Sequence, residues 1–424
     1  MTASSRLHAL LLVGAVLAGC GGGGGDTPAS SSPPSAPSNP GGAGTPTAGT
    51  SSGTSGSSAS VSVPQSNTPN VHPISVTVAP GLTRNMLTTS VTVCQSGTSH
   101  CATVDDIQVD TGSNGLRILA SALPAGLALP AVPSGGGVTG ECAAFGSGYA
   151  WGAVRSADVR MAGQLAASIP IHLIADAALP AVPADCASAG PAMQTVASLR
   201  GNGILGIGLF TSDCGGGCTS AALPRWYYRC TADGNCMASA QTLAQQVTNP
   251  VSRFALDNNG VVIDLPAIAD TGAPSVSGSL IFGIGTQADN TLGGASVVKA
   301  NAANGYVVTT GNGQTYAQSY IDSGSNGIFF PDTQLQLCGT WYCPSSPQPV
   351  SAVIAGTNGS ASAVSFSVGN SALLFGSPNN AFNNLAGTAA RSFDWGLPFF
   401  FGRRVYTAIA ARDTSAGPGP YYAF

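Results

Sequence analysis

The stretch IQVDTGSNGLRIL (residues 107–119) is nearly repeated 212 positions later as SYIDSGSNGIFFPD (residues 319–332). Each copy places Asp-(Thr/Ser)-Gly-Ser-Asn-Gly between two apolar runs, so each predicts a tight turn between two buried strands. An isolated carboxylate at the end of a buried strand is expensive to desolvate. Two such carboxylates, Asp110 and Asp322, therefore indicate a partnership between the two halves of the chain.

The composition is that of a folded protein with few charges. The 424-residue chain is 43% hydrophobic, which is enough to supply cores for two lobes. Only 8% of the residues are charged, the formal net charge is −4, and no run of Lys or Arg occurs. These features exclude disorder of the whole chain and argue against nucleic acid or anionic lipid headgroups as partners.

The chain from residue 71 onward is expected to be mainly β. Short runs rich in Val, Ile, Thr and aromatic residues are separated by Gly, Asn, Asp or Pro, as strands are separated by turns. The clearest helix candidate is Met237–Val247. A β-rich chain with one motif in each half predicts a two-lobed fold, with an N-terminal lobe at residues 71–248 and a C-terminal lobe at residues 249–424.

The first twenty residues, MTASSRLHALLLVGAVLAGC, contain a basic start, a short apolar run and a final Leu-Ala-Gly-Cys. This order resembles a bacterial lipoprotein signal, in which residues 1–19 are removed and Cys20 is lipidated. An ordinary cleaved signal peptide that happens to end in Cys is the alternative. Because Gly21 rather than Asp follows the Cys, we expect an outer-membrane anchor. The Gly-, Ser-, Thr- and Pro-rich residues 20–70 then predict a disordered tether, which carries the domain in the periplasm or at the cell surface.

The eleven cysteines also indicate export. Lipidation of Cys20 leaves ten, an even number suited to five disulfides in an oxidising compartment. The four thiols between residues 214 and 236 have the count of a zinc site, but their spacing fits one poorly, so disulfides that close small loops are preferred. We expect neither a metal nor a cofactor. Four pairs are close in sequence: Cys94 and Cys101, Cys214 and Cys218, Cys230 and Cys236, and Cys338 and Cys343.

The two repeated turns resemble the paired active-site motifs of pepsin-like aspartic peptidases, one motif in each lobe. Other landmarks follow in the order of that family: a flap hairpin at 145–163, an apolar-apolar-Gly segment at 202–208, the start of the second lobe at 277–285 and the last core strands at 395–409. The resemblance covers residues 73–424 and implies a two-lobed fold with pseudo-twofold symmetry. The arrangement also resembles bacterial envelope lipoproteins of unassigned function.

The resemblance implies a role for each motif residue. Asp110 and Asp322 would be the catalytic pair, because two close carboxyls share one proton, and one then acts as base on a water while the other polarises the substrate carbonyl. Donation by nearby Ser hydroxyls would favour the charged carboxylates and an acidic working pH. The supporting loop residues would be Thr111, Gly112, Ser113, Ser323, Gly324 and Ser325. The flap residues that contact substrate would be Phe145, Gly146, Ser147 and Gly148.

Departures from the family pattern leave the activity open. Phe145 stands where the family has a flap Tyr, the second apolar-apolar-Gly segment reads Gly396-Leu397-Pro398, and no inhibitory propeptide is recognisable. The expected function is an envelope-anchored aspartic endopeptidase that hydrolyses a peptide or protein substrate. The alternative is a catalytically weak or inactive lipoprotein that binds a peptide or partner in the same interlobe cleft.

Other motifs are assigned simpler roles. A third Asp-Thr-Gly, at residues 270–272, lacks an apolar run after the turn and is expected to be a loop. Residues 321–324 superficially resemble the nucleophile loop of chymotrypsin-like serine peptidases, but no histidine lies in a matching motif. His172 is expected to be a strand residue with local partners. The aromatic runs at 225–230 and 398–401 are expected in packing, with a place along the cleft as the alternative.

Overall fold

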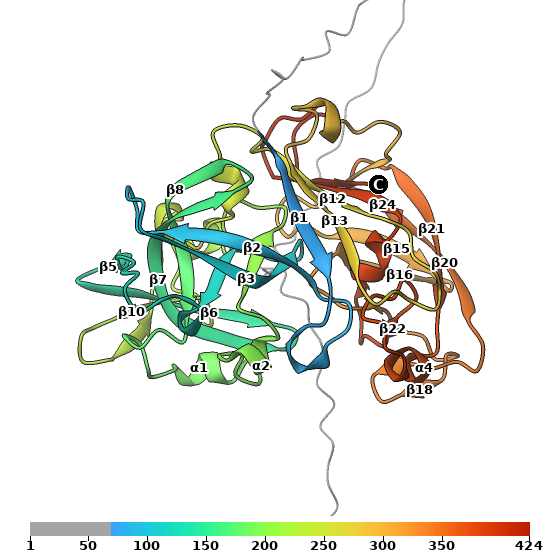
Figure 1. Ribbon diagram of the computed structural model, residues 1–424, viewed down its shortest axis with the longest axis horizontal. Helices are drawn as coiled ribbons and strands as arrows, with labels where there is room; N and C mark the ends of the chain where they lie inside the picture. The colour runs from blue at the N-terminus through green and yellow to red at the C-terminus, as the bar shows by residue number, and fades with distance from the viewer. Residues whose placement is uncertain (1–68) are drawn as a thin grey trace, which may run out of the picture.

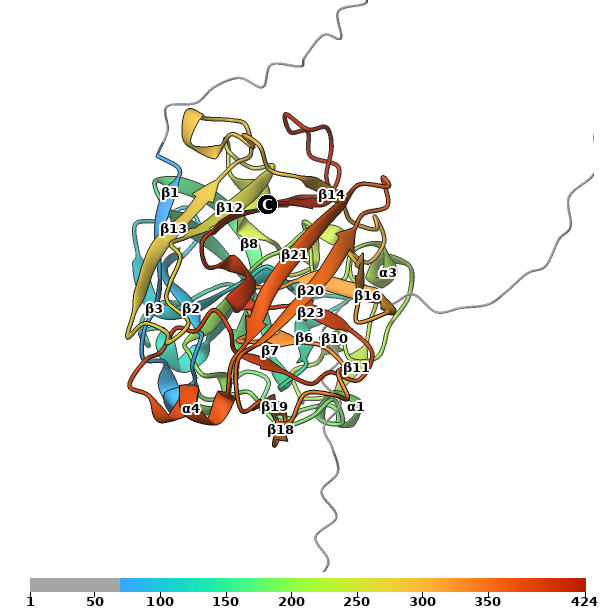
Figure 2. The same cartoon turned by 90° about the vertical axis from the view of Figure 1, so that its right-hand side faces the viewer.

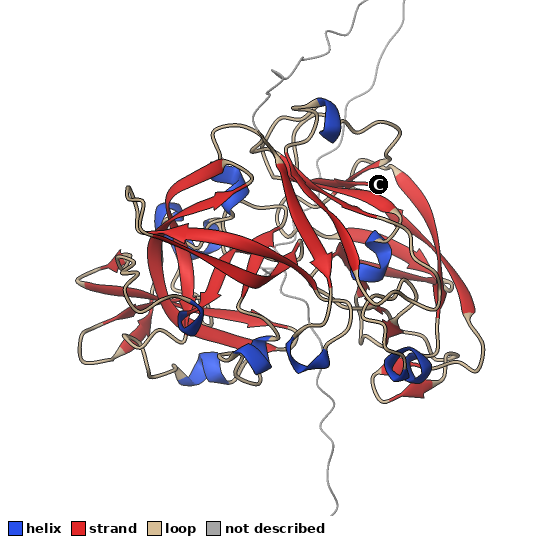
Figure 3. Cartoon of the chain, in the orientation of Figure 1, coloured by secondary structure: helices blue, strands red, loops and turns tan. Residues whose placement is uncertain are grey.

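The computed structural model describes residues 69–424, and most of their regular structure is β (Figures 1 and 3). The prediction of a mainly β chain is therefore confirmed. The predicted signal peptide, the lipidation site at Cys20 and nearly all of the tether lie outside the described residues. No helix within residues 69–424 is both long and apolar enough to cross a membrane.

The larger of two sheets has sixteen strands, drawn from both halves of the chain. These are β1 (Val71–Val76), β2 (Leu87–Cys94), β3 (Cys101–Asp110), β4 (Asn114–Leu119), β5 (Pro133–Ser134), β6 (Gly137–Phe145), β7 (Gly148–Met161), β8 (Gln164–Ile174), β9 (Gly203–Ile207), β10 (Tyr227–Cys230), β11 (Cys236–Ala238), β12 (Gly260–Leu265), β13 (Val276–Phe282), β14 (Val297–Lys299), β24 (Arg403–Ala408) and β25 (Tyr421–Ala423). Because β2 pairs with both β3 and β7, the run β7, β8, β4, β9, β3 and β2 closes into a barrel. β1 joins this barrel to β13, with which it pairs along its whole length (Figure 1).

The smaller sheet has nine strands, all from the second half of the chain. These are β15 (Val307–Gly311), β16 (Gln314–Ile321), β17 (Ile328–Phe329), β18 (Leu337–Cys338), β19 (Trp341–Tyr342), β20 (Gln348–Ala355), β21 (Ala361–Val368), β22 (Ala386–Gly387) and β23 (Phe393–Trp395). The hairpin of β20 and β21 crosses the face shown in Figure 2. In β20, buried and exposed residues alternate, as expected for a strand with one face on the core.

The helices are all short. The α-helices are α1 (Ala184–Ala187), α2 (Val196–Leu199), α3 (Gly216–Ser220) and α4 (Ser371–Gly376). The 3-10 helices are η1 (Pro80–Leu82), η2 (Ala120–Ala122), η3 (Leu243–Gln245), η4 (Pro250–Arg253), η5 (Ala288–Asn290) and η6 (Leu397–Phe400). None is long enough to be stable alone, so tertiary packing must hold them.

The helix predicted at Met237–Val247 is wrong. Met237 belongs to β11, which pairs with β10 and is joined to it by the Cys230–Cys236 disulfide. Only η3 within this stretch is helical, because Thr242 and Gln245 form a capping box around a single turn. The local preference for a helix was overridden by strand pairing and a disulfide, which the local sequence does not reveal.

Five disulfides link the ten cysteines of the described residues, as predicted. Four of them join the pairs that are close in sequence. The fifth, Cys142–Cys186, joins β6 to α1 across 44 positions. The four cysteines considered for zinc are instead two disulfides, Cys214–Cys218 and Cys230–Cys236.

Both motif turns are built from three strands in the same arrangement. In the first half, β9 lies between β3 and β4, parallel to β3 and antiparallel to β4. In the second half, β23 pairs parallel with β16 and antiparallel with β17. All five residues of β9 and all three of β23 are buried, which explains their unbroken apolar character apart from Asp394. The matching sequences therefore fold into matching local topologies.

Candidate active site

The structure brings the two motif aspartates into direct contact. Asp110 ends β3 and Asp322 follows β16, and their carboxyl groups hydrogen-bond to each other. The glycines of both motifs make this approach possible. A Cβ on Gly112 would lie 2.5 Å from Asp322 Cγ, and a Cβ on Gly324 would lie 2.7 Å from Asp110 Cγ. A side chain at either position would therefore push the carboxyls apart.

Each aspartate accepts the same two hydrogen bonds from its own loop. The backbone N–H two residues further on donates to Oδ1 at 2.7 Å in both halves. The hydroxyl three residues further on donates to Oδ2, at 2.5 Å from Ser113 to Asp110 and at 2.9 Å from Ser325 to Asp322. These bonds favour the charged carboxylates. The predicted roles of both serines as donors are confirmed.

Thr111 and Ser323 lock the two loops together. The Thr111 N–H donates to Ser323 Oγ at 3.1 Å, and the Ser323 N–H donates to Thr111 Oγ1 at 2.9 Å. Each hydroxyl in turn donates to a carbonyl of the opposite motif, Thr111 to Ile321 O at 3.0 Å and Ser323 to Val109 O at 2.8 Å. The polar atoms of this buried crossing are thereby satisfied, and the predicted bonds between the halves are confirmed.

The two aspartates share one proton. Burial, and then the adjacent negative charge of Asp110, raise the pKa of Asp322 well above its ordinary value. Two carboxyls in contact cannot both ionise cheaply, so they hold one proton between them and titrate as a pair.

The segments beneath the two loops also correspond, which corrects one interpretation of the sequence. The second apolar-apolar-Gly segment is not Gly396-Leu397-Pro398, because the structure places Trp395-Gly396 beneath the loop. Trp395 pairs with Ile321, and its carbonyl accepts from the Asp322 N–H at 3.0 Å. Gly396 packs on the motif loop, where a Cβ would lie 2.0 Å from Gly327 O. The loop of Asp322 is therefore supported in the same way as that of Asp110, which pairs with Gly206.

A third carboxyl group lies close to the pair, and sequence analysis missed it. Asp394 on β23 pairs in register with Tyr320, two residues before Asp322, and is only 5% exposed. Burial, and then the charge of Asp322, raise the pKa of Asp394 well above its ordinary value. The available signal was an acidic residue directly before Trp395-Gly396.

A cleft of about 600 Å³ opens beside the two motif loops, and of the two motif aspartates Asp322 lines it whereas Asp110 does not. Residues from both halves of the chain line it, and they are largely apolar, aromatic or glycine; they include Leu209, Phe210, Trp226, Gly305, Tyr320 and Tyr422. Among residues 69–424, the charged side chains on its walls are Asp213 and Asp322. Trp226, from the aromatic run at 225–230, thus takes the cleft position considered as an alternative. The run at 398–401 is buried in the core, as expected.

The predicted flap forms a hairpin but lies away from this cleft. β6 and β7 pair through Phe145 and Gly148, with Gly146 and Ser147 at the tip. None of these four residues lines the cleft. The tip packs instead on the 191–193 segment, where the Ser147 hydroxyl donates to Met193 Sδ at 3.2 Å. The hairpin prediction is confirmed, whereas contact of this tip with substrate stays a prediction.

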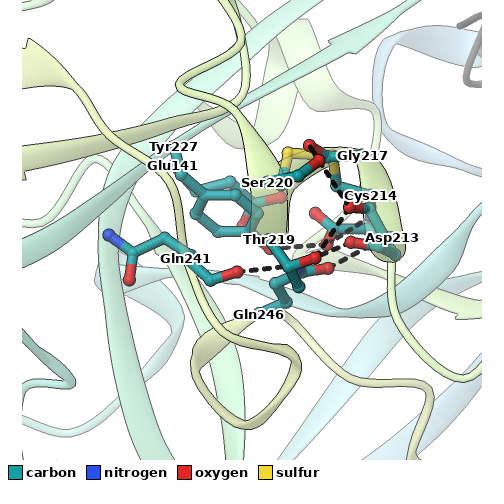
Figure 4. Close-up of a disulfide and its surroundings, with 12 residues drawn as sticks. Glu141, Asp213, Cys214, Gly217, Thr219, Ser220, Tyr227, Gln241 and Gln246 are labelled. Atoms are coloured by element: carbon teal, nitrogen blue, oxygen red, sulfur yellow. Dashed lines mark hydrogen bonds between the residues drawn. A yellow bond between two sulfur atoms is a disulfide. The ribbon is translucent and has the colours of Figure 1, made fainter.

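A buried charged cluster stands behind the first-half wall of the cleft. Arg117 donates to Glu141 Oε1 at 2.7 Å and to Asp213 Oδ2 at 3.1 Å, and Tyr227 donates to Asp213 Oδ1 at 2.5 Å. Figure 4 shows Asp213 beside the Cys214–Cys218 disulfide, with Glu141 and Tyr227 next to it. Burial, and then the charge of Glu141, raise the pKa of Asp213 well above its ordinary value. No motif marks Glu141 or Asp213 in the sequence.

His172 is a strand residue, as predicted, on β8. Its ring is fully buried, with Nδ1 3.1 Å from Glu141 Oε2. Burial, and then the charge of Arg117, lower the pKa of His172 well below its ordinary value, so the ring is neutral. Within residues 69–424, no group of His, Cys, Asp and Glu side chains has the arrangement of a metal site. The third Asp-Thr-Gly is a loop, as expected, and Asp270 is exposed.

Residues 66–424 match a protein family described as "Protein of unknown function (DUF3443)", and the chain belongs to that family. The match spans both motifs, the cleft and all twenty-five strands of the described residues. A search of curated proteins finds no match.

Proposed function

We propose that this protein is an aspartic-type endopeptidase with a two-lobed, pepsin-like fold. The supporting observation is the direct contact between the Asp110 and Asp322 carboxyls beside an open cleft, with the same hydrogen bonds around each. The lobes would be residues 71–248 and 249–424, related by a pseudo-twofold axis between the motif loops. A carboxyl pair that shares one proton supplies both a base and an acid for water attack on a peptide.

In the proposed reaction, Asp110 acts as general base and Asp322 as general acid. Asp110 takes a proton from a water whose oxygen attacks the carbonyl carbon of an extended peptide, while Asp322 gives its proton to the carbonyl oxygen. The resulting gem-diol collapses when Asp110 passes its proton to the amide nitrogen, the C–N bond breaks, and a diol hydroxyl returns a proton to Asp322. This assignment follows from the raised pKa of Asp322. No covalent intermediate with the protein forms.

The close contact argues against a glycoside hydrolase. Retaining glycosidases hold their two carboxyls about 5–5.5 Å apart, and inverting ones about 6.5–9.5 Å apart, to leave room for the sugar or a water. Carboxyls that hydrogen-bond to each other leave room for neither. Hydrolysis of a peptide by a pair of carboxyls uses one proton held between them, and this geometry allows such sharing.

One observation favours the second candidate, a catalytically weak lipoprotein that binds a peptide or partner protein in the same cleft. The four expected flap residues lie outside the cleft lining, so the tip of this hairpin does not cover the cleft in the structure. Exclusion of water strengthens catalytic electrostatics. A cleft without a lid binds an extended segment but catalyses less well.

Cleavage of a denatured protein by the purified chain between pH 3 and 8 tests the proposal. We expect acidic, pepstatin-sensitive cleavage that is lost in Asp110→Asn and in Asp322→Asn. Asp270→Asn is the matched control, because this aspartate lies in an Asp-Thr-Gly on an exposed loop. Peptide binding without cleavage at any of these pH values would support the second candidate. Cleavage that survives in Asp110→Asn would reject the dyad.

We also propose that the chain is an outer-membrane lipoprotein anchored through Cys20. The proposal rests on the lipobox-like Leu-Ala-Gly-Cys and on the Gly after it. Cys20→Ser should release the protein from the membrane fraction and abolish incorporation of a labelled fatty acid. Retention in the membrane without Cys20 would contradict the anchor.

A further inference from the structure

The third carboxyl, Asp394, has an unusual environment. Its Oδ1 has no hydrogen-bond partner in the part of the chain that the structure describes. The titratable groups that face it are Asp322 and Asp110 from the motif loops, Tyr320 from β16 and Tyr422 from β25. None of these groups is a cation. A buried carboxylate without a counter-ion is strongly disfavoured, so Asp394 holds its proton and has an O–H to donate.

Ser325 connects Asp394 to the catalytic pair. Its hydroxyl donates to Asp322 Oδ2 at 2.9 Å. The Asp394 carboxyl faces the same hydroxyl, which partly offsets the rise in the pKa of Asp394. A hydroxyl has one proton and two acceptor lone pairs, so Ser325 cannot donate to both carboxyls at once. If Asp394 donates to Ser325 Oγ, the Ser325 proton is left for Asp322. If Asp394 ionises, the two carboxylates compete for that proton.

The first half of the chain has no such third acid. The residue of β9 that pairs two positions before Asp110 is Ile204, opposite Gln108. The corresponding residue of β23, opposite Tyr320, is Asp394. Ser113 therefore serves Asp110 alone, whereas Ser325 lies between two carboxyls. The extra acid is the clearest difference between two otherwise matching loops.

We propose that Asp394 is a positioning residue whose carboxylic acid donates to Ser325 Oγ and thereby holds the Ser325 hydroxyl on Asp322. This inference rests on the proposed peptidase function. Asp394 does not line the cleft, and it acts on Asp322 through Ser325. The arrangement makes the two members of the pair inequivalent, because only the serine that serves Asp322 has a third carboxyl beside it. When Asp394 ionises at higher pH, its charge and its competition for Ser325 both oppose ionisation of Asp322.

Substitution of Asp394 tests this role through the pH profile. Asp394→Asn keeps a donor for Ser325 but removes the ionisable group. We expect a kcat at acidic pH within about twofold of wild type, and an alkaline limb moved to lower pH, because Asp322 loses a repelling neighbour. Asp394→Leu removes the donor, and kcat should fall about tenfold with little change in KM, as for one lost hydrogen bond. Asp270→Asn should change none of these quantities.

A second measurement does not depend on activity. Carboxyl titrations followed by NMR in protein labelled with ¹³C at the Asp side-chain carboxyls should show one high-pKa signal missing in Asp394→Asn and a second one shifted to lower pH. If the wild type cleaves no substrate, the proposed peptidase function is wrong. The titration still shows whether Asp394 and Asp322 are coupled. An unchanged titration of the remaining high-pKa group, or an equal kcat loss in the Asn and Leu variants, would overturn the positioning role. The near-isosteric Asn variant carries the test should the Asp394→Leu variant fail to fold.

Discussion

At the residue scale, the contact between the two acids depends on the absence of two side chains. Gly112 lies against the Asp322 carboxyl and Gly324 against the Asp110 carboxyl. Neither contact leaves room for a Cβ atom. Gly112→Ala should therefore separate the pair and reduce cleavage about 100-fold, the scale of a displacement of about 1 Å at a reacting group. Peptide hydrolysis at the pH optimum measures this.

The matched control for that substitution is Gly126→Ala. Gly126 is exposed, with no atom within 4 Å of a Cβ built there. The activity of the Gly126→Ala variant should equal that of the wild type. Full activity in Gly112→Ala would show that the carboxyls need not touch.

The crossing of Thr111 and Ser323 contributes to stability as well as to geometry. Ser323→Ala leaves the buried Thr111 N–H without its 3.1 Å acceptor and Val109 O without its 2.8 Å donor. We expect the free energy of unfolding in urea to fall by about 1–3 kcal/mol. Ser351→Ala, which removes an exposed bond to Ser365, should change it by less than about 0.5 kcal/mol. Equal losses in the two variants would mean that the crossing is not a stabilising feature.

The residues that sequence analysis identified are those with a motif around them. Asp110 and Asp322 were predicted because each lies in a turn sequence framed by apolar runs. Asp394 and Asp213 lie in no motif, and their partners come from distant strands and loops. Their importance follows from burial beside other acids, which a single sequence does not contain.

At the element scale, strand pairing determined what could be predicted. The β character followed from local composition, and the two turns followed from their repeat. The strand register could not be predicted in this way. β9 and β23 each insert between the two strands of a motif. A shift of one position in the pairing of β23 would move Trp395-Gly396 away from its place beneath Asp322. Likewise, the β6–β7 hairpin was predictable from its turn, but where its tip packs depends on the 191–193 segment.

The cluster behind the cleft wall links three elements through one guanidinium. Arg117 on β4 bonds Glu141 on β6 and Asp213 in the loop before α3. Arg117→Met leaves two buried carboxyls unpaired and should reduce the free energy of unfolding by about 3–5 kcal/mol at pH 7. The loss should be smaller at pH 4.5, where Asp213 more readily keeps a proton. Urea denaturation at the two pH values measures both effects.

Arg404→Met is the comparison for a surface ion pair. Arg404 lies 3.5 Å from Asp264, and both side chains are about 40% exposed. The expected loss is below about 1 kcal/mol at either pH. A loss in Arg117→Met no larger than this would show that the buried cluster is not a structural support.

The disulfides should differ in their contribution according to the loop that each closes. Cys142–Cys186 closes 44 positions and Cys338–Cys343 closes five. Loop-closure entropy predicts about 4 kcal/mol for the first and about 2 kcal/mol for the second. Paired Cys→Ala variants compared by chemical denaturation test the order. A larger loss from the short loop would mean that native-state contacts, rather than chain entropy, dominate.

At the scale of the whole molecule, the site exists only because the two halves meet. Each half supplies one acid, one crossing hydroxyl and one wall of the cleft, and a continuous apolar core extends through both sheets. The repeated motif was enough to predict that the acids are partners. It did not predict the third acid on one side or the charged cluster on the other, which are features of one half alone.

This asymmetry determines how stability should depend on pH. Burial raises the pKa of Asp213, Asp322 and Asp394 above the ordinary value of 3.8. Folding therefore keeps protons that the unfolded chain releases, so the stability contributed by the neutral acids is complete below pH 3.8 and is lost as the pH rises through their folded values. The two buried histidines act oppositely. Their lowered pKa values remove stability as the pH falls below the ordinary 6.5.

Above pH 6.5 the histidine effect ends and the acids act alone. Asp322→Asn leaves both histidines in place, so its difference from the wild type isolates Asp322. As the pH rises from 3.8 through the raised pKa of Asp322, we expect the wild type to lose stability relative to Asp322→Asn, by up to about 1.4 kcal/mol per pH unit for the one proton. Asp270→Asn, at an exposed carboxyl, should follow the wild type. Urea unfolding at half-unit pH intervals gives all three curves. A difference between the wild type and Asp322→Asn that stays constant with pH would mean that Asp322 has no raised pKa in the folded protein, and a carboxyl pair that shares a proton would then be excluded.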